Sequence, residues 1–136
     1  MKRVPLRKRG ASKLSRLEDE ADTLLQKAVC AGGGCAICGS RVGLGGHHVI
    51  PRSRCHGKLY LLRYAPRNMV RLCWKCHERA DTHKAEFDAW FTKHRSEDAL
   101  WLDDRDTGES NTSSSMRTGE HLREIIETLR GCAGQS

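Results

Sequence analysis

Hydrophobic positions in the first part of the chain recur at helical spacing. Between residues 13 and 29 they fall at Leu14, Leu17, Ala21, Leu24, Leu25 and Ala28. Ser12 or Ser15 is placed to cap the start, acidic residues at 18–20 suit the first turns, and glycines at 32–34 end the pattern. The spacing therefore predicts an amphipathic helix over about 13–29.

Two short apolar stretches follow, and a longer polar segment separates them. The first predicts a strand over His47–Ile50 that stops at Pro51, and the second predicts an antiparallel strand over Met69–Leu72. The segment 52–67 between them is expected to be a basic, irregular loop. A helix is expected from about Trp74, either broken at Thr82 or continued, and a further helix over 84–95.

The chain divides into four segments by composition. We expect a basic disordered arm at 1–12, one domain at 13–102 with its motif core at 35–83, a flexible linker at 103–119, and a short helix with a tail at 120–136. The last helix has an apolar face made by Leu122, Ile125, Ile126 and Leu129. Because so short a helix is marginal alone, it must dock on the domain, on a protein partner or on its own copy.

Charge narrows the class of partner. The 136 residues include 24 Lys and Arg against 17 Asp and Glu, a net charge of +7, which favours a polyanion such as nucleic acid.

Apolar runs are too short to cross a bilayer, and acidic residues stand where a signal peptide would need an apolar core. We therefore expect a cytoplasmic protein without membrane association, whose cysteines are reduced.

The cysteines show metal-ligand spacing. Four of the seven form two Cys-x-x-Cys pairs, at Cys35, Cys38, Cys73 and Cys76. Four thiolates satisfy tetrahedral zinc and leave no open position, so the spacing predicts a closed structural zinc site. Cys30, Cys55 and Cys132 stand outside this spacing, with Cys55-His56 as an alternative ligand pair.

Histidines indicate a second site within the same stretch. His47 and His48 are neighbours on a predicted strand, so their side chains should point to opposite faces, one toward a metal and one toward a water or phosphate. His77 and Asp81 are four residues apart on a predicted helix, a good spacing for two ligands of one ion. His83 lies off that face if the helix is regular.

These motifs resemble a known family. His47-His48, Asn68 and Cys73-x-x-Cys76-His77 are similar to the HNH endonuclease motif, in the zinc-supported form of bacteriophage proteins. The resemblance covers roughly residues 30–95. It implies a small α+β fold with a ββα-metal (His-Me finger) core, a zinc knuckle of four cysteines and flanking helices, and for a phage-encoded protein it implies the host cytoplasm.

The resemblance also implies roles for individual residues. His47 and His77 would hold one catalytic divalent ion, His48 would be the general base, and Asn68 would pin the loop between the strands. Asp81 stands where the family often has a further His ligand. A carboxylate suits Mg²⁺ or Mn²⁺, with Ni²⁺ also among the candidate metals, and His83 is the rival ligand.

The implied activity is metal-dependent hydrolysis of DNA phosphodiester bonds, by nicking or double-strand cleavage. Basic residues between the two strands are either phosphate contacts or solvated surface: Arg52, Arg54, Lys58, Arg63 and Arg67. The alternative function is a non-catalytic, zinc-dependent module that binds nucleic acid or serves as an adaptor. Its partners would be DNA or a protein bound through the C-terminal helix.

Overall fold

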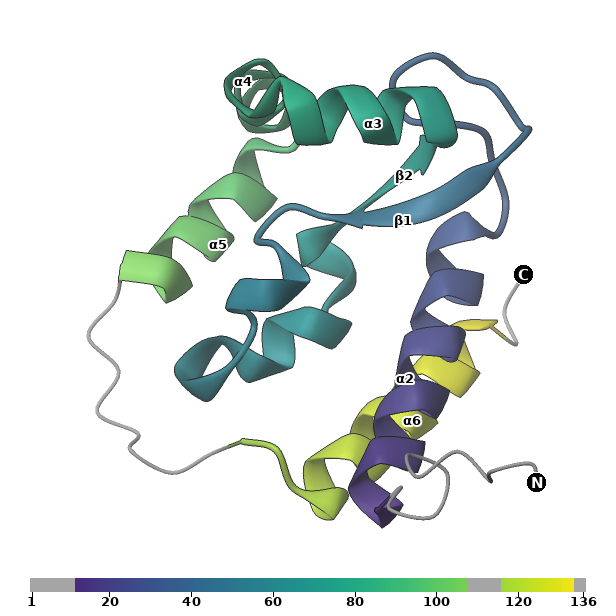
Figure 1. Cartoon of the computed structure of the whole chain (residues 1–136), viewed down its shortest axis with the longest axis vertical. Helices are drawn as coiled ribbons and strands as arrows, with labels where there is room; N and C mark the ends of the chain where they lie inside the picture. Colours follow the sequence, from purple (N-terminus) through teal and green to yellow (C-terminus); the bar gives the residue numbers. More distant parts are fainter. Residues whose placement is uncertain (1–11, 108–115, 134–136) are drawn as a thin grey trace, which may run out of the picture.

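A two-stranded antiparallel sheet lies between helical segments (Figure 1). The computed structural model describes residues 12–107 and 116–133. In chain order the elements are α2 (Lys13–Cys30), β1 (Leu44–His48), the 3₁₀ helices η1 (Arg52–Arg54), η2 (Gly57–Tyr64) and η3 (Pro66–Asn68), β2 (Met69–Cys73), α3 (Trp74–Thr82), α4 (Lys84–His94), α5 (Ser96–Thr107) and α6 (Gly119–Ala133). The fold is therefore a small α+β arrangement, as predicted.

The first helix matches its prediction. The Ser12 hydroxyl accepts a hydrogen bond from the Ser15 amide at 3.1 Å, so Ser12 is the cap of the two candidates. Ala21 and Leu25 are buried on the inner face of α2. The helix ends at Cys30, before the glycine run.

The sheet confirms one predicted strand and corrects the other. β2 is antiparallel to β1, with His47 opposite Val70 and His48 opposite Met69. The first strand is Leu44–His48, not His47–Ile50. Gly46 enters the sheet where the space is tight, since a Cβ there would lie 2.5 Å from Met69 Cε.

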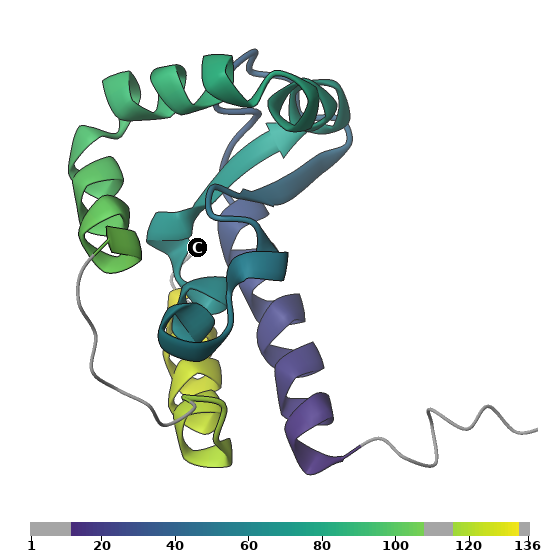
Figure 2. The ribbon, with the colours of Figure 1, turned by 60° about the vertical axis from the view of Figure 1, so that its left-hand side comes forward.

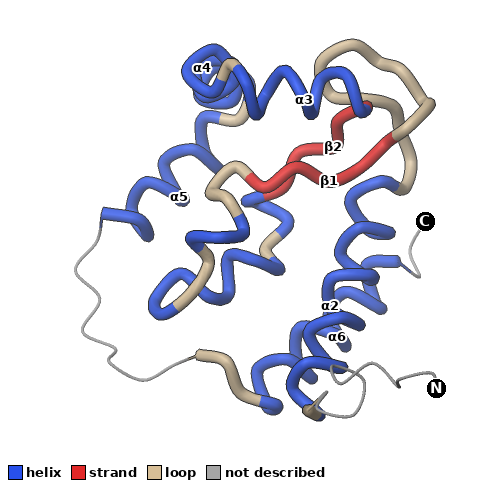
Figure 3. Tube along the Cα trace, in the orientation of Figure 1, coloured by secondary structure: helices blue, strands red, loops and turns tan. Residues whose placement is uncertain are grey.

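The sequence predicted an irregular loop over 52–67, and this prediction is wrong. The segment forms η1, η2 and the start of η3 (Figure 3), and η2 buries Leu59, Tyr60, Leu62 and Tyr64. These apolar side chains contribute to the core. The sequence analysis missed them because basic residues lie among them in the chain. The segment is thus a packed layer beneath the sheet.

The two helices after the sheet also match their predictions. α3 ends at Thr82, and His83 adopts a non-helical conformation, so the helix is interrupted before α4. α4 buries Phe87 and Phe91 against the core. The interruption fixes which α3 side chains can face β1.

The predicted linker is partly wrong. Residues 103–107 form the end of α5, a helix that the sequence did not predict. Residues 108–115 of that linker, and all of the predicted arm except Ser12, lie outside the described residues. The division into domains stays a prediction.

The C-terminal helix docks on its own chain. α6 lies beside α2 (Figures 1 and 2), and Leu122 and Ile126 pack with Ala21, Tyr60 and Tyr64. Leu129 packs with Leu25 and Met69. Among the helices in the described part of the chain, none has the length and apolar character needed to cross a membrane.

Candidate functional site

The first Cys-x-x-Cys pair sits on a tight turn. The Gly39 amide donates to the Cys35 carbonyl at 2.9 Å, and Gly39 has φ of +80°, a conformation that favours glycine. The Cys35 amide donates to the Ser40 carbonyl at 2.7 Å, and the Ala36 amide to the Arg71 carbonyl at 2.8 Å. The turn is therefore attached to β2, next to the second pair.

The four predicted cysteines converge. The sulfur atoms of Cys35, Cys38, Cys73 and Cys76 all lie within 4.8 Å of one another, and Cys38 Sγ is 3.6 Å from Cys73 Sγ. This group can hold a metal ion. Cys55 is elsewhere: its thiol donates to the Ile50 and Pro51 carbonyls, and burial raises its pKa to about 11.

Thiol chemistry agrees with a cation in this cluster. Burial raises the pKa of Cys35, but backbone hydrogen bonds from Cys38, Cys73 and Ile37 outweigh it and lower that pKa to about 6. Burial and the neighbouring sulfurs raise the pKa of Cys76. A state with four adjacent thiolates would need a compensating positive charge, which a bound metal supplies.

A second group forms between β1 and α3. His47 Nδ1 lies 3.8 Å from Asp81 Oδ1, and His77 Nδ1 lies 3.3 Å from Asp81 Oδ2. One ligand atom from each of the three residues falls within 4.8 Å of the others. This set can also hold a metal ion.

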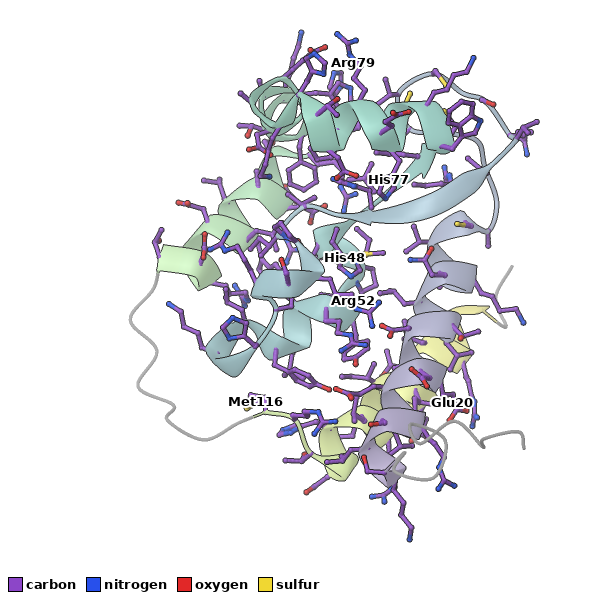
Figure 4. All side chains as sticks on the ribbon, viewed as in Figure 1. Glu20, His48, Arg52, His77, Arg79 and Met116 are labelled. Carbon is purple, nitrogen blue, oxygen red and sulfur yellow. The ribbon has the colours of Figure 1, made fainter. Side chains whose placement is uncertain are left out.

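Local structure explains why these three side chains meet. His77 and Asp81 are one turn apart on α3, and Figure 4 shows His77 on the side of α3 that faces β1, whereas Arg79 points away. The His47 ring stands edge-on to those of His77 and Phe87, with centroids 4.6 and 4.9 Å away. Burial, together with nearby His77, lowers the pKa of His47 to about 4, so this imidazole is neutral at pH 7, the form that can bind a metal.

His48 points to the other side of β1, toward the 3₁₀ segment (Figure 4). Its Nε2 lies 2.9 Å from the Arg63 carbonyl oxygen. Because a carbonyl can only accept, Nε2 must carry the proton, and Nδ1 of the neutral ring keeps its lone pair. Burial lowers the pKa of His48, which favours this neutral form.

Asn68 holds the segment between the strands. It is fully buried, with 0% exposure, and its Oδ1 accepts from the Ile50 amide at 2.7 Å. Its Nδ2 donates to the carbonyls of Ile50 and Leu62, both at 3.1 Å. The side chain thus ties the end of β1 to η2, the helix that also provides the carbonyl partner of His48.

A pocket of about 320 Å³ lies beside the second ligand group and His48, and its lining includes His47, His48, His77 and Asp81. Two cations also line it, Arg52 and Lys84. Lys84 was missed by the sequence analysis. Its spacing carries no signal, because it follows the helix break and only the fold brings it to the pocket.

His83 lies apart from this group. Its Nδ1 is 2.9 Å from the Thr82 hydroxyl, and it lines a different hollow with Arg79, Phe87 and Trp90. The helix break turns it away from β1. Among the described residues, the convergent set contains Asp81 and not His83.

The predicted basic contacts all have partners within the chain. Arg52 pairs with Asp22 at 3.2 Å, Arg54 with Asp106 at 2.6 Å, Arg63 with Asp22 at 2.6 Å and Arg67 with Asp98 at 2.7 Å, and Lys58 donates to the Asp106 carbonyl at 3.1 Å. The Arg63 side chain is only 16% exposed, whereas that of Arg52 is 57% exposed. Whether they contact DNA stays a prediction.

Comparison with known proteins bears on the same stretch. Residues 35–82 match the model of a protein family described as HNH endonuclease. No curated protein and no solved structure matches the chain. The matched stretch contains both groups of possible metal ligands, and it also contains His48 and Asn68. The match indicates a nuclease or another nucleic-acid-related function. Over residues 35–82 the chain is therefore similar to the HNH endonuclease family.

Proposed function

We propose that this protein is a metal-dependent HNH endonuclease that hydrolyses DNA phosphodiester bonds. The observation that carries the proposal is one pocket in which His47, His77 and Asp81 converge beside His48. A ligand set alone would suit a structural metal. A neutral imidazole with a free nitrogen in the same pocket adds a base.

In this proposal β1, β2 and α3 form a ββα-metal unit. His47, His77 and Asp81 would hold one divalent ion, and the carboxylate makes Mg²⁺ or Mn²⁺ suitable, with Ni²⁺ as a further candidate. When bound, the ion supplies positive charge that stabilises the phosphate and the leaving oxygen. The position of His83 supports Asp81 as the third ligand.

The four-cysteine group would hold a structural zinc ion. Its sulfur donors fit zinc, and four protein ligands leave no position for substrate or water. Cys76 and His77 are adjacent, so the zinc cluster would fix the start of the helix that carries two ligands of the other ion. The zinc would thus act through shape and not through chemistry.

The base in this mechanism is His48 Nδ1. The Arg63 carbonyl holds Nε2–H, which leaves Nδ1 to take a proton from a water molecule in the pocket. The water oxygen forms a bond to phosphorus as the bond from phosphorus to the 3′-oxygen breaks. The products carry a 5′-phosphate and a 3′-hydroxyl group. Asn68 acts as a positioning residue, because it fixes the segment that contains Arg63.

Phosphate contacts would come first from Arg52 and Lys84, since both line the pocket. Arg54, Lys58 and Arg67 could follow the strand further away, after exchanging their present partners. Arg63 is better explained as a structural residue, because its side chain is nearly buried between Asp22 and Glu18. A protein partner would use the exposed face of α6, since its apolar face packs on α2. We place the reaction in the cytoplasm, in that of the host for a phage-encoded protein.

A plasmid assay tests the proposal. Supercoiled DNA is incubated with zinc-loaded protein and added Mg²⁺, Mn²⁺ or Ni²⁺, beside an EDTA control. We expect nicked or linear DNA only with a divalent ion, and a loss of at least about 100-fold in rate for His48→Ala.

His94→Ala is the matched control, because His94 is an exposed histidine outside both ligand groups. It should cut at the wild-type rate. Equal cutting by wild type and His48→Ala would refute the assignment of the base. DNA binding without any cutting would favour the non-catalytic module.

A further inference from the structure

A second hollow borders the proposed ion site. It has a volume of about 410 Å³, lies at the start of β1 and of α3, and includes His77 and Asp81 in its lining. The pocket that contains His48 lies at the other end of β1 and shares the same two residues. The two hollows therefore meet at the ion ligands, on either side of them along β1.

One wall of this hollow is the indole of Trp74. Trp74 is the first residue of α3, and it is 59% exposed although it is a large apolar side chain. The ring lies against Gly43, where a Cβ would be 2.8 Å from Trp74 Cδ1. Lys75 Nζ is 5.7 Å from the ring centroid, near the limit of a cation–π contact.

The other wall is bare backbone. Gly45 precedes His47 by two residues, so the two positions face the same side of the strand. A Cβ on Gly45 would meet no atom within 4 Å. A flat group can therefore enter between β1 and the indole without displacing a side chain.

Charge distinguishes the two hollows. Arg52 and Lys84 line the pocket beside His48, which suits phosphate. Among the described residues, the lining of the second hollow contains no Lys or Arg and contains the carboxylates of Glu78 and Asp81. Carboxylates repel phosphate, but they accept hydrogen bonds from the amino groups of nucleobases. The lining thus fits a base and not a backbone.

We propose that this hollow is a nucleobase subsite, in which the base next to the cleaved phosphate stacks on Trp74 and donates to Glu78. The inference rests on the proposed nuclease function and narrows its substrate class. A base within a duplex is covered by its neighbours on both sides and paired at its edge. The substrate class is therefore nucleic acid with an unpaired nucleotide beside the cut bond, such as a single strand, a flap or a junction.

Binding measurements test the subsite without cleavage. Zinc-loaded full-length protein is titrated into a labelled single strand of about twelve nucleotides, and into the matching blunt duplex, without added divalent ion. Fluorescence anisotropy reports each Kd. Trp74→Ala should weaken single-strand binding about tenfold and duplex binding less than about twofold, and Trp74→Phe should retain most of the affinity.

Two further variants protect the test against a folding effect at Trp74. Gly45→Val fills the hollow from an unstrained strand position, and it should cause the same selective loss. Glu78→Gln should reduce a preference for oligo-dC over oligo-dT, because thymine lacks the amino group. Leu100→Ala, which removes an exposed apolar side chain on α5, should change nothing.

Equal losses for single strand and duplex, or an unchanged single-strand Kd in Gly45→Val, would overturn the subsite. These results are independent of the cleavage assay. A selective loss at Trp74 in a protein that never cuts DNA would refute the nuclease and retain the subsite. Metal-dependent DNA cutting, together with no selective loss of single-strand binding in Trp74→Ala, would support the nuclease and refute the subsite.

Discussion

Adjacent histidines contact different elements because a strand sends neighbouring side chains to opposite faces. His47 meets His77 and Asp81 on α3, and His48 meets the Arg63 carbonyl on η2. The proposed ligand and the proposed base therefore have their partners on different elements. Their separation depends on the register of β1, because a shift by one residue would exchange the two faces.

Asn68 gives a prediction at the scale of one residue. Asn68→Ala would leave the Ile50 amide without its side-chain acceptor, and the Ile50 and Leu62 carbonyls would keep only the weaker contacts from the Cys55 thiol and the Ala65 amide. We expect the free energy of unfolding to fall by about 3 kcal/mol, measured by urea denaturation of the zinc-loaded protein. We also expect a lower rate of DNA cleavage, because η2 would no longer fix the Arg63 carbonyl that accepts from His48.

Gln26→Ala is the comparison for that variant. Gln26 also bonds two backbone groups, those of Gly46, but it is only partly buried, so water can replace it. We expect a loss of about 1 kcal/mol. If the two variants lost the same free energy, burial of the Asn68 amide would not be the cause.

At this scale the sequence predicted which side chains converge and not their surroundings. Helical spacing placed His77 and Asp81 on one face, the family resemblance selected His47 from the His-His pair, and these three side chains do converge. The partner of His48 is a backbone carbonyl, which carries no signal in the sequence. Arg63 and Arg67 were grouped by charge alone, and only the fold brings Asp22 and Asp98 to them.

Among the elements, the four-cysteine cluster reinforces a connection that the backbone hydrogen bond from Ala36 to Arg71 also makes. It connects the turn at Cys35–Cys38 with the junction of β2 and α3. Sheets of two strands are marginal on their own, so a bound metal would contribute directly to folding. The geometry of the second ligand group then depends on the first.

Cys38→Ser tests that dependence. A structural zinc ion contributes about 10–16 kcal/mol in small fingers, as much as or more than the total stability of about 5–15 kcal/mol for a typical domain. We therefore expect Cys38→Ser to lose zinc and its cooperative thermal transition, as followed by metal analysis and circular dichroism. Cys30→Ser is the control, since Cys30 lies outside the cluster, and it should keep both.

A Cys38→Ser protein that unfolded at the wild-type temperature would contradict this role.

Element predictions from sequence were accurate where periodicity was strong, as in α2, β2, α3 and α4. They failed at β1, where Gly46 enters a strand in tight contact with Met69, in η2, where apolar residues lie among basic ones, and at α5, which was not predicted. The first two errors arose because packing overrides local preference.

The whole molecule is joined by a charged network beneath the sheet. Arg117 donates twice to Glu18, at 2.9 Å each, and the Tyr60 hydroxyl donates to Glu18 at 2.5 Å. Arg63 Nη1 is 3.7 Å from the same carboxylate. Glu18 on α2 thus connects the segment before α6 with η2, whose Arg63 carbonyl holds His48.

The charge state of Glu18 sets the conditions for its test. Hydrogen bonds from Arg117 lower its pKa below 4.5, against the opposing effect of burial. A lowered pKa in the folded state means that the carboxylate stabilises fully above 4.5, and that this contribution declines as pH falls through the folded value. The stabilisation is therefore complete at pH 7.

A double-mutant cycle with Glu18→Gln and Arg117→Gln measures the network at pH 7. We expect a coupling free energy of about 1–3 kcal/mol from urea denaturation, because the Glu18 side chain is only 10% exposed. Glu20 and Arg130 form a matched pair between α2 and α6, with side chains 40% and 63% exposed. Their cycle should give less than about 0.5 kcal/mol, since water screens an exposed pair. Equal couplings would mean that the buried carboxylate has no special part in attaching the C-terminal helix, and that apolar contacts of Leu122 and Ile126 are sufficient.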